Sequence, residues 1–262
     1  AAGGNALGNS GSAYLYMRNA GAWSQLQKIV ASDRADNDQF GVSVAINGRY
    51  AFVGAYQEDE DEFGNNTLND AGSAYFFHLP QVPLNLKLWL EGPYDPDMQL
   101  MNDALRTLPS FPLLEPYTAL GYTDPASGGG EATTPGVLAV SGNDAVVDWV
   151  RIELRSATDP AVIVATRHGL LQRDGDVVNA TDGTSQVMLD AGPGNYYVAV
   201  RHRNHLACMR SNPIPLNLIA NSINFRSSLT ATYGTDARKN INGAMALWAG
   251  DCTGDGQLLY MG

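Results

Sequence analysis

The chain has 262 residues, enough for one large domain or two of ordinary size. Its 27 acidic and 16 basic side chains give a formal charge of −11, which argues against nucleic-acid binding and against adsorption to an anionic membrane, because both need a surface rich in Lys and Arg. No apolar stretch approaches the roughly 18–20 residues that a membrane-spanning helix requires, so we expect neither a nucleic-acid partner nor membrane insertion.

The start of the chain recurs 61 residues later without a gap. When residues 3–14 are laid over residues 64–75, seven of the twelve positions are identical. A fixed period of this size indicates a repeat architecture, in which each unit covers the hydrophobic face of its neighbour. The chain holds little more than one such period, so we expect a second polypeptide, or the other half of this one, to complete it.

Residues 1–79 are predicted to form four short strands and the beginning of a fifth. The alternation of apolar and polar residues and the position of the turns place these strands at residues 12–18, 23–31, 40–46, 50–55 and 73–78. Asn47-Gly48, between the third and fourth strands, predicts a tight hairpin, because a type I′ turn needs positive φ at both central residues. Four strands per period are typical of a propeller blade.

The run DNDQFGVSVAINGRYAFVG, from Asp36 to Gly54, precedes an acidic loop and the word GSAYFF. Its word order and spacing resemble the FG-GAP repeat of bacterial surface proteins and of the integrin head, with Phe40-Gly41 and Val53-Gly54-Ala55 as the named parts of the motif. The resemblance covers residues 1–79 and implies an antiparallel blade and a secreted, cell-surface location. Members normally carry about seven such repeats in a closed ring, and this chain departs from that number.

The rest of the chain is predicted to contain a linking segment and a second β-rich module. Residues 80–136 combine one strand (84–90) and one short helix (97–108) with a Pro/Gly-rich stretch that we expect to wrap over a surface. From residue 137 onward, strands recur about every ten residues with Gly, Asp and Asn between them, which predicts a β-sandwich over 137–262. The expected fold is therefore all-β, with one FG-GAP-type four-stranded blade and one sandwich.

The second module also carries a resemblance. The words LLQRDGDVV, GNYYVAVRHRNHLA and WAGDCTGDGQ are similar to a C-terminal module of large exported bacterial surface proteins, which are loosely described as adhesins or haemagglutinins. This resemblance covers residues 84–262, and it implies little about function because that family is itself poorly defined.

The last residues contain a spacing typical of a calcium loop. Asp251, Thr253 and Asp255 offer oxygen donors at positions one, three and five, and Gln257 offers a backbone carbonyl at position seven. The run resembles the calcium loop of dockerin-type segments, although position twelve is Gly262 instead of a bidentate carboxylate. The alternative is a tight Asp/Gly turn that ends the sandwich.

A second calcium hypothesis concerns the acidic run at residues 58–62, in the loop where related blades often hold calcium. Asp59 and Asp61 fit a D-x-D-x-D-G arrangement, Phe63 stands where the third oxygen is needed, and Asp70 could contribute from further along. The alternative is a solvated acidic loop without an ion.

The two cysteines, Cys208 and Cys252, match neither a metal-type CxxC spacing nor a redox motif. In an exported protein they could form a disulfide, and the alternative is two buried free thiols. His202 and His205 are three residues apart, so on one continuous strand they would point to opposite faces, which argues against a two-histidine metal site.

Nothing in the sequence predicts a catalytic site. There is no GxSxG elbow, no cysteine stands in a protease-like context, and no pair among the 27 acidic residues is marked for glycoside cleavage. We therefore expect a protein that is not an enzyme.

An isolated blade leaves strand edges unpaired, and such edges template pairing with another chain. The sequence thus favours a structural subunit of an extracellular fibre, joined to copies of itself or to other surface proteins by strand addition. The competing hypothesis is a calcium-dependent adhesin that binds a glycan or a protein, and a third is an accessory module of a carbohydrate-active enzyme. The aromatic residues that could stack on a sugar are Tyr14, Tyr16, Tyr56, Tyr75 and Phe77.

Overall fold

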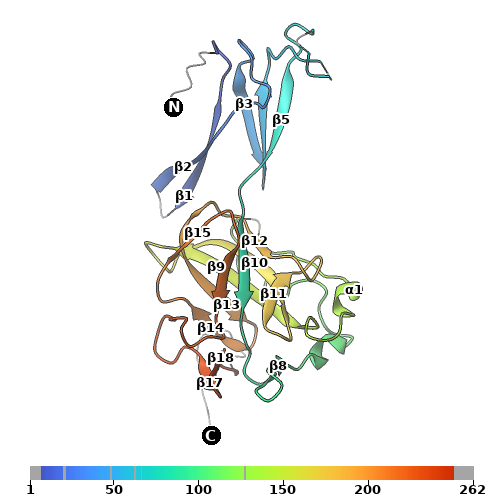
Figure 1. The fold of residues 1–262 in the computed structure, drawn as a ribbon, viewed down its shortest axis with the longest axis vertical. Helices are drawn as coiled ribbons and strands as arrows, with labels where there is room; N and C mark the ends of the chain where they lie inside the picture. The colour runs from blue at the N-terminus through green and yellow to red at the C-terminus, as the bar shows by residue number, and fades with distance from the viewer. Residues whose placement is uncertain are drawn as a thin grey trace. The chain divides into compact units, whose positions relative to one another are not determined.

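The computed structural model describes residues 7–19, 22–47, 49–61, 63–65, 67–126 and 128–250. The chain divides into two compact units, Ala1–Pro80 (unit 1) and Gln81–Gly262 (unit 2), and both consist mainly of strands (Figure 1). Within the described ranges, the helical segments are η1 (Ala104–Thr107) and α1 (Pro135–Leu138), each of four residues. The all-β prediction, with a blade and a sandwich, is confirmed.

In the described part of unit 1 there are five strands, close to the five predicted positions. β1 (Ala13–Asn19) and β2 (Ala22–Ile29) form an antiparallel hairpin. β3 (Phe40–Asn47), β4 (Tyr50–Ala55) and β5 (Ser73–His78) form a three-stranded antiparallel sheet with β4 in the centre. A parallel bridge from Gly11 to Phe40 ties the start of β1 to the start of β3.

The grouping of these strands differs from the predicted one. The sequence analysis assigns the first four strands to one blade and β5 to the next, whereas in the structure β5 pairs with β4 along its whole length. The repeat explains the difference, since β1 and β5 are the segments that recur 61 residues apart. The β1–β2 hairpin therefore corresponds to the last two strands of one repeat, and β3–β5 to the first three strands of the following repeat.

Unit 1 has a small core of its own between the hairpin and the three-stranded sheet. Alternation along β4 directs Ala51, Val53 and Ala55 to the face that this core occupies. Phe40 lies at its centre, in edge contact with the rings of Tyr75 and Phe77 at centroid distances of 5.3 and 6.0 Å. The hairpin contributes further apolar residues to this cluster, namely Ala13, Leu15 and Ile29.

Unit 2 is built on a nine-stranded sheet with the order β12-β6-β11-β10-β9-β13-β14, in which β15 also pairs with β13 and β16 with β6. Neighbouring strands are antiparallel except for the parallel pair β6 and β16. The strands of this sheet are β6 (Val82–Lys87), β9 (Val146–Ser156), β10 (Ile163–Gln172), β11 (Asp176–Asn179), β12 (Val187–Leu189), β13 (Gly194–His202), β14 (His205–Met209), β15 (Ile214–Leu216) and β16 (Asn221–Asn224). Two short hairpins accompany it, β7 (Tyr94–Asp95) with β8 (Leu100–Met101) and β17 (Lys239–Ile241) with β18 (Ala244–Ala246).

The sheet of unit 2 curls around its main core. Leu84 and Leu86 of β6 share one buried cluster with Ile152 and Leu154 of β9, although β11 and β10 stand between these two strands in the sheet. A flat sheet could not bring them together, so the sheet closes over itself in the manner of a sandwich. Figure 1 shows this curled arrangement of β9, β10 and β13.

The segment before β9 lies against unit 2 and belongs to it. The sequence predicts a separate linking segment over 80–136, but β6 lies inside the nine-stranded sheet and Phe111 and Tyr117 join a second buried cluster with Trp149. The predicted helix over 97–108 is wrong, because this stretch contains only β8 and the single turn η1. Apolar residues at 98, 101, 105 and 108 therefore do not reflect helical periodicity here.

Candidate functional site

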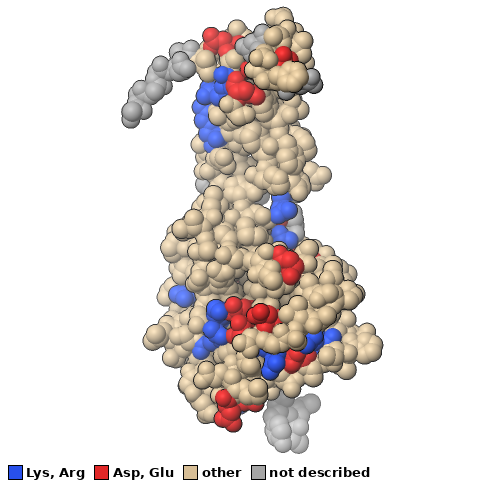
Figure 2. Space-filling view, turned by 45° about the vertical axis from the view of Figure 1, so that its right-hand side comes forward, with Lys and Arg blue, Asp and Glu red and all other residues tan. Residues whose placement is uncertain are grey.

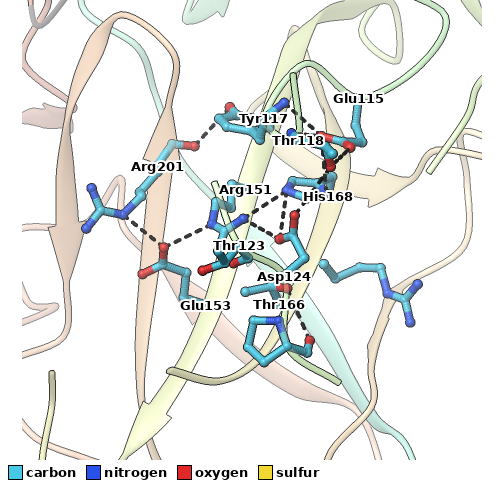
Figure 3. A network of polar contacts seen from close by, with 12 residues as sticks. Glu115, Tyr117, Thr118, Thr123, Asp124, Arg151, Glu153, Thr166, His168 and Arg201 are labelled. Carbon is cyan, nitrogen blue, oxygen red and sulfur yellow. Dashed lines mark hydrogen bonds and ion pairs between the residues drawn. The ribbon is translucent and has the colours of Figure 1, made fainter. Parts of the chain in front are cut away.

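A network of buried charges occupies the second face of β9 in unit 2 (Figure 3). Arg151 is fully buried, and its Nε donates a hydrogen bond of 3.0 Å to Oε1 of Glu153. The same guanidinium donates to the carbonyl oxygen of Thr123 at 2.7 Å and forms an ion pair with Asp124. Arg151 therefore fastens the loop at 123–124 to the centre of the sheet.

Glu153 is the acidic centre of this network. It accepts hydrogen bonds from Arg155 at 2.5 Å and from Arg201 of β13 at 2.9 Å, in addition to the one from Arg151. Burial alone would raise the pKa of Glu153, but the charges of Arg201 and Arg155 hold the pKa below its ordinary value. The carboxylate is therefore ionised and shared among three guanidinium groups.

His168 of β10 extends the network towards two further acids. Its Nδ1 lies 2.8 Å from Oε2 of Glu131 and 3.7 Å from Oε2 of Glu115, and its ring stacks on Tyr117 at a centroid distance of 5.0 Å. These three residues could in principle hold a metal, since their potential ligand atoms lie within 4.8 Å of one another. However, Glu131 is also paired with Arg167.

Glu115 is likewise engaged by the protein itself. Its carboxylate accepts backbone N–H groups of Tyr117 at 2.7 Å, Thr118 at 3.1 Å and Gly130 at 3.1 Å. Glu115, Glu131 and His168 are therefore satisfied by hydrogen-bond donors and charged partners within the protein, and they hold residues 115–126 and 128–131 on the sheet. We assign these three residues no ligand.

A second polar group in unit 2 joins Asp148 to two histidines. Asp148 accepts hydrogen bonds from Arg203 at 2.8–3.0 Å and lies 3.1 Å from Nε2 of His202. The Nδ1 atoms of His202 and His205 are 2.9 Å apart, and burial together with the charge of His202 lowers the pKa of His205 to about 4. The expectation that these histidines point apart assumed one continuous strand, whereas in the structure a turn separates β13 from β14 and makes the two histidines cross-strand partners.

The loop between β4 and β5 in unit 1 holds the two acids proposed from sequence as calcium ligands. Asp61 accepts N–H groups of Asn65 and Phe63 and the hydroxyl of Thr67, at 2.8–3.0 Å. The hydrogen bonds from Asn65 and Thr67 lower its pKa to about 2. Asp59 accepts the N–H of Asp70 at 2.7 Å. Both carboxylates thus stabilise the loop, and calcium binding by them stays a prediction.

Glu58 and Glu60 alternate along the chain with Asp59 and Asp61, and their carboxylates come close to a third acid. Glu58 and Glu60 lie with Asp33 such that one oxygen of each carboxylate is within 4.8 Å of one oxygen of the others. Tyr75 of β5 donates its hydroxyl to Asp33 at 2.6 Å. The period of two in extended chain could have indicated that Glu58 and Glu60 share a side. Asp33, which lies far away in the sequence, could not have been assigned to them.

The remaining predicted site residues are Cys208, which lies in β14, and five residues outside the described chain. Cys208 of β14 is buried, and burial raises the pKa of its thiol to about 12. Cys252 and the four predicted calcium ligands Asp251, Thr253, Asp255 and Gln257 lie outside the described residues. The calcium loop and the cysteine pairing therefore stay predictions.

The strands of unit 1 also expose much apolar surface. Large side chains that are at least 45% exposed come from every strand of this unit, and they are Tyr14, Tyr16, Trp23, Val42, Val44, Ile46, Phe52 and Phe76. Several of them line a groove of about 570 Å³ between the hairpin and the sheet. Figure 2 shows a broad uncharged surface along the unit, with acidic side chains gathered near one end.

Comparison with known proteins identifies one part of the chain. Residues 23–77 match the family described as FG-GAP repeat, a span that includes β3, β4, the acidic loop and all of β5 except its last residue. No curated protein and no solved structure matches the chain. The resemblance of the first unit to FG-GAP repeats is thereby confirmed over this span, whereas the adhesin-like and dockerin-like resemblances receive no support and stay predictions.

FG-GAP repeats occur in extracellular proteins. Among the described residues, no helix has both the length and the apolar character needed to cross a membrane.

Proposed function

We propose that this chain is a non-enzymatic structural subunit of an extracellular assembly, in which copies join head to tail through unit 1. The match of residues 23–77 to a repeat that occurs in extracellular proteins, and is typically non-enzymatic, supports the location and the absence of catalysis. Repeat units of this kind are stabilised when each one buries a face of its neighbour.

The contact between the hairpin and the sheet within unit 1 provides the template. Ala13 and Leu15 of β1 pack on the core cluster that contains Phe40 and Val53. In the 61-residue repeat, Ala13 and Leu15 align with Ala74 and Phe76 of β5. If the repeats are equivalent, the Ala74 and Phe76 side of β5 is a surface for packing against a further blade.

That surface is exposed, and this is the observation on which the proposal depends. Phe76 is 50% exposed and lies on the sheet face opposite the core, beside Phe52 and Tyr50. The ring of Phe76 stacks on Tyr50 at a centroid distance of 4.9 Å and contacts Phe52 at 5.0 Å. Burying this aromatic face would contribute about 25 cal/mol for each Å² of apolar surface removed from water.

A second copy offers the surface that fits. Tyr14 and Tyr16 of β1 align with Tyr75 and Phe77 of β5 in the 61-residue repeat. Tyr75 and Phe77 pack on the same core cluster as Ala13 and Leu15 of β1. In β1 the tyrosines are about half exposed. We therefore expect the face of β5 that carries Phe76 in one copy to pack on the face of β1 that carries Tyr14 and Tyr16 in another copy.

Strand edges can add to this contact. Among the described strands, β2 pairs with β1 and β5 with β4, so each leaves one edge unpaired. Backbone pairing across copies would satisfy these N–H and C=O groups. Because the two contact surfaces differ, the contact is heterologous, and it produces a filament unless it closes into a ring.

Light scattering coupled to size-exclusion chromatography, with electron microscopy of the same samples, tests the proposal. We expect the 262-residue chain to form oligomers whose mass rises with concentration. Phe76→Ser should shift them to monomer while the circular dichroism spectrum stays unchanged, because Phe76 lies outside the core. Leu229→Ser is the matched control, since Leu229 is a 94% exposed apolar residue of unit 2.

A monodisperse monomer at the highest soluble concentration would contradict the assembly. So would oligomers that persist unchanged in Phe76→Ser, because the aromatic face would then not mediate the contact.

Glycan binding is the second candidate, and one observation favours it. Tyr16 and Trp23 lie on the same face of the β1–β2 hairpin, where Trp23 is 67% exposed. Exposed aromatic rings of this kind provide apolar stacking surfaces for sugars. A glycan array probed with and without calcium, using wild type and Trp23→Ala, would favour an adhesin if monomers bound and the variant did not.

A further inference from the structure

The turn between β13 and β14 in unit 2 brings two buried imidazole rings together. His202 ends β13 and His205 begins β14, with Arg203 and Asn204 between them. Each histidine is 5% exposed, and the ring planes meet at 80° with their centroids 4.7 Å apart. The two Nδ1 atoms lie 2.9 Å from each other.

The Nε2 atom of each ring already donates to the protein. Nε2 of His202 lies 3.1 Å from Oδ2 of Asp148, and Nε2 of His205 lies 2.9 Å from the carbonyl oxygen of Glu91. Carboxylate and carbonyl oxygens only accept hydrogen bonds, so each Nε2 carries a hydrogen atom. In a neutral imidazole the other nitrogen then presents a lone pair, and both Nδ1 atoms are therefore potential metal ligands.

A third acceptor atom lies at the same place. Oδ1 of Asn204 is 2.8 Å from Nδ1 of His205, and the backbone N–H of Asn204 is directed at Nδ1 of His202 at 3.5 Å. Lone pairs at these distances repel each other unless a positive charge lies between them. One proton can join only two of the three acceptor atoms, whereas one metal ion can bind all three. Asn204 is exposed, so an ion can enter from solvent.

The partners of the two rings match those that usually surround a metal-bound histidine. Such a histidine donates its other N–H group to a carboxylate or a backbone carbonyl, which fixes the orientation of the ring. Asp148 and the carbonyl group of Glu91 provide one partner of each kind. Asp148 also accepts hydrogen bonds of 2.8–3.0 Å from Arg203, so the position of its carboxylate is fixed and its charge is compensated.

The distances between the ligand atoms indicate which metals fit. Imidazole nitrogen binds such ions at about 2.0–2.1 Å, so two ligand atoms at a right angle are about 2.8–3.0 Å apart, and at the tetrahedral angle about 3.3–3.4 Å. The observed 2.9 Å between the Nδ1 atoms and 2.8 Å between Nδ1 and Oδ1 fit the right angle. Right angles between nitrogen and oxygen ligands are typical of Cu²⁺ and Ni²⁺, and Cu²⁺ binds more tightly than Ni²⁺.

We propose that Nδ1 of His202, Nδ1 of His205 and Oδ1 of Asn204 bind one divalent transition-metal ion, with Cu²⁺ preferred and water in the remaining positions. The ion would fasten the end of β13 to the start of β14. The N–H of Gly250 donates to the carbonyl oxygen of Asn204 at 3.0 Å, so the ion would also stabilise the segment that pairs with this turn. The site lies in unit 2 and does not depend on the proposed assembly, which uses unit 1.

Titration of the chelator-treated 262-residue chain with copper(II) chloride, followed by calorimetry and electron paramagnetic resonance, tests the site. We expect one tightly bound equivalent whose spectrum shows coupling to imidazole nitrogen. His205→Gln removes a nitrogen ligand, while the glutamine amide can still donate to the carbonyl oxygen of Glu91. It should lower the affinity by about tenfold or more, because the loss of even an outer partner of a ligand costs about 10–100-fold.

Asn204→Ala is a second variant, at an exposed position where the fold should be unaffected. It should lower the copper affinity by a smaller factor than His205→Gln, because it removes an oxygen ligand and leaves both imidazoles. His78→Gln is the matched control, since it removes an exposed imidazole of β5 in unit 1. This control should bind copper as wild type does.

Thermal unfolding gives an independent readout. Copper should raise the melting temperature of wild type and of His78→Gln, because an ion that binds only the folded state stabilises it by mass action. The rise should be absent or smaller in His205→Gln, whose circular dichroism spectrum without metal shows whether the variant is folded.

Three results would overturn the proposal. The first is no binding of Cu²⁺, Ni²⁺ or Zn²⁺ by wild type, which would leave a shared proton between the two Nδ1 atoms. The second is an unchanged affinity and spectrum in both His205→Gln and Asn204→Ala, which would locate any copper elsewhere. The third is an equal loss of affinity in His78→Gln and His205→Gln, which would indicate general attraction of copper to histidine.

Discussion

At the scale of single residues, the unusual feature of unit 2 is charge placed inside a sheet. Arg151 and Glu153 of β9 are each about 1% exposed, and Thr123 and Asp124 lie against Arg151 on the face from which both side chains project. Two charges in such a place are tolerated only when each finds good partners, and removal of one partner leaves the other buried and uncompensated. Glu153, with three arginines, is the residue whose loss matters most.

Glu153→Gln should therefore lower the free energy of unfolding of unit 2 by about 3–5 kcal/mol, which is the usual cost of breaking a buried ion pair. The glutamine retains the shape but removes the charge that compensates Arg151, Arg155 and Arg201. Denaturant titration followed by tryptophan fluorescence measures the change.

Asp176→Asn is the control for that substitution. Asp176 pairs with Lys87 at a position where both side chains are more than one third exposed, so its loss should cost about 1 kcal/mol or less. Equal destabilisation by the two substitutions would show that burial of the Glu153 network carries no special energetic weight.

At the scale of elements, two glycines let the hairpin approach the sheet of unit 1. Gly11 has φ +81° and Gly41 has φ +96°. A Cβ atom at Gly41 would lie 2.6 Å from the carbonyl oxygen of Ser12, and one at Gly11 would lie 2.0 Å from that of Phe40. Phe40 anchors the core while Gly41 permits the close backbone contact, which gives the Phe-Gly pair of this repeat a physical reason.

Gly41→Ala should destabilise unit 1 by about 2 kcal/mol or more, because the new methyl group meets backbone atoms and the residue has positive φ. Thermal unfolding followed by circular dichroism measures the effect. Gly64→Ala is matched to it, since Gly64 has φ +76° with no atom within 4 Å of an added Cβ, and should cost about 1 kcal/mol. If the two variants were equally stable, the close approach would not be a constraint.

At the scale of the whole molecule, each unit has its own hydrophobic core. The cluster around Phe40 and Val53 serves unit 1, and the cluster with Leu84 and Ile152 serves unit 2. Units with separate cores generally unfold separately.

Differential scanning calorimetry should therefore record two transitions. Gly41→Ala should lower the midpoint of one and Glu153→Gln that of the other. A single transition that both substitutions displace would mean that the units unfold as one cooperative body.

Much of the local structure follows from the amino-acid sequence alone. Short alternating runs such as YAFVGA and SAYFFH, bounded by Gly and Asn, encode β4 and β5, since a strand needs only a period of two and a turn at each end. The words around Phe40-Gly41 were sufficient to recognise the FG-GAP repeat. Both signals are local, so no knowledge of distant partners was required.

Tertiary structure alone decided which strands pair and which acids meet. β5 joins β4, and β6 enters the sheet of unit 2, because strand pairing depends on hydrogen bonds between segments far apart in the sequence. The same reason brings Asp33 to Glu58 and makes His202 and His205 partners across a turn. A pattern along one chain records which side a residue faces, but only the folded chain determines what lies opposite.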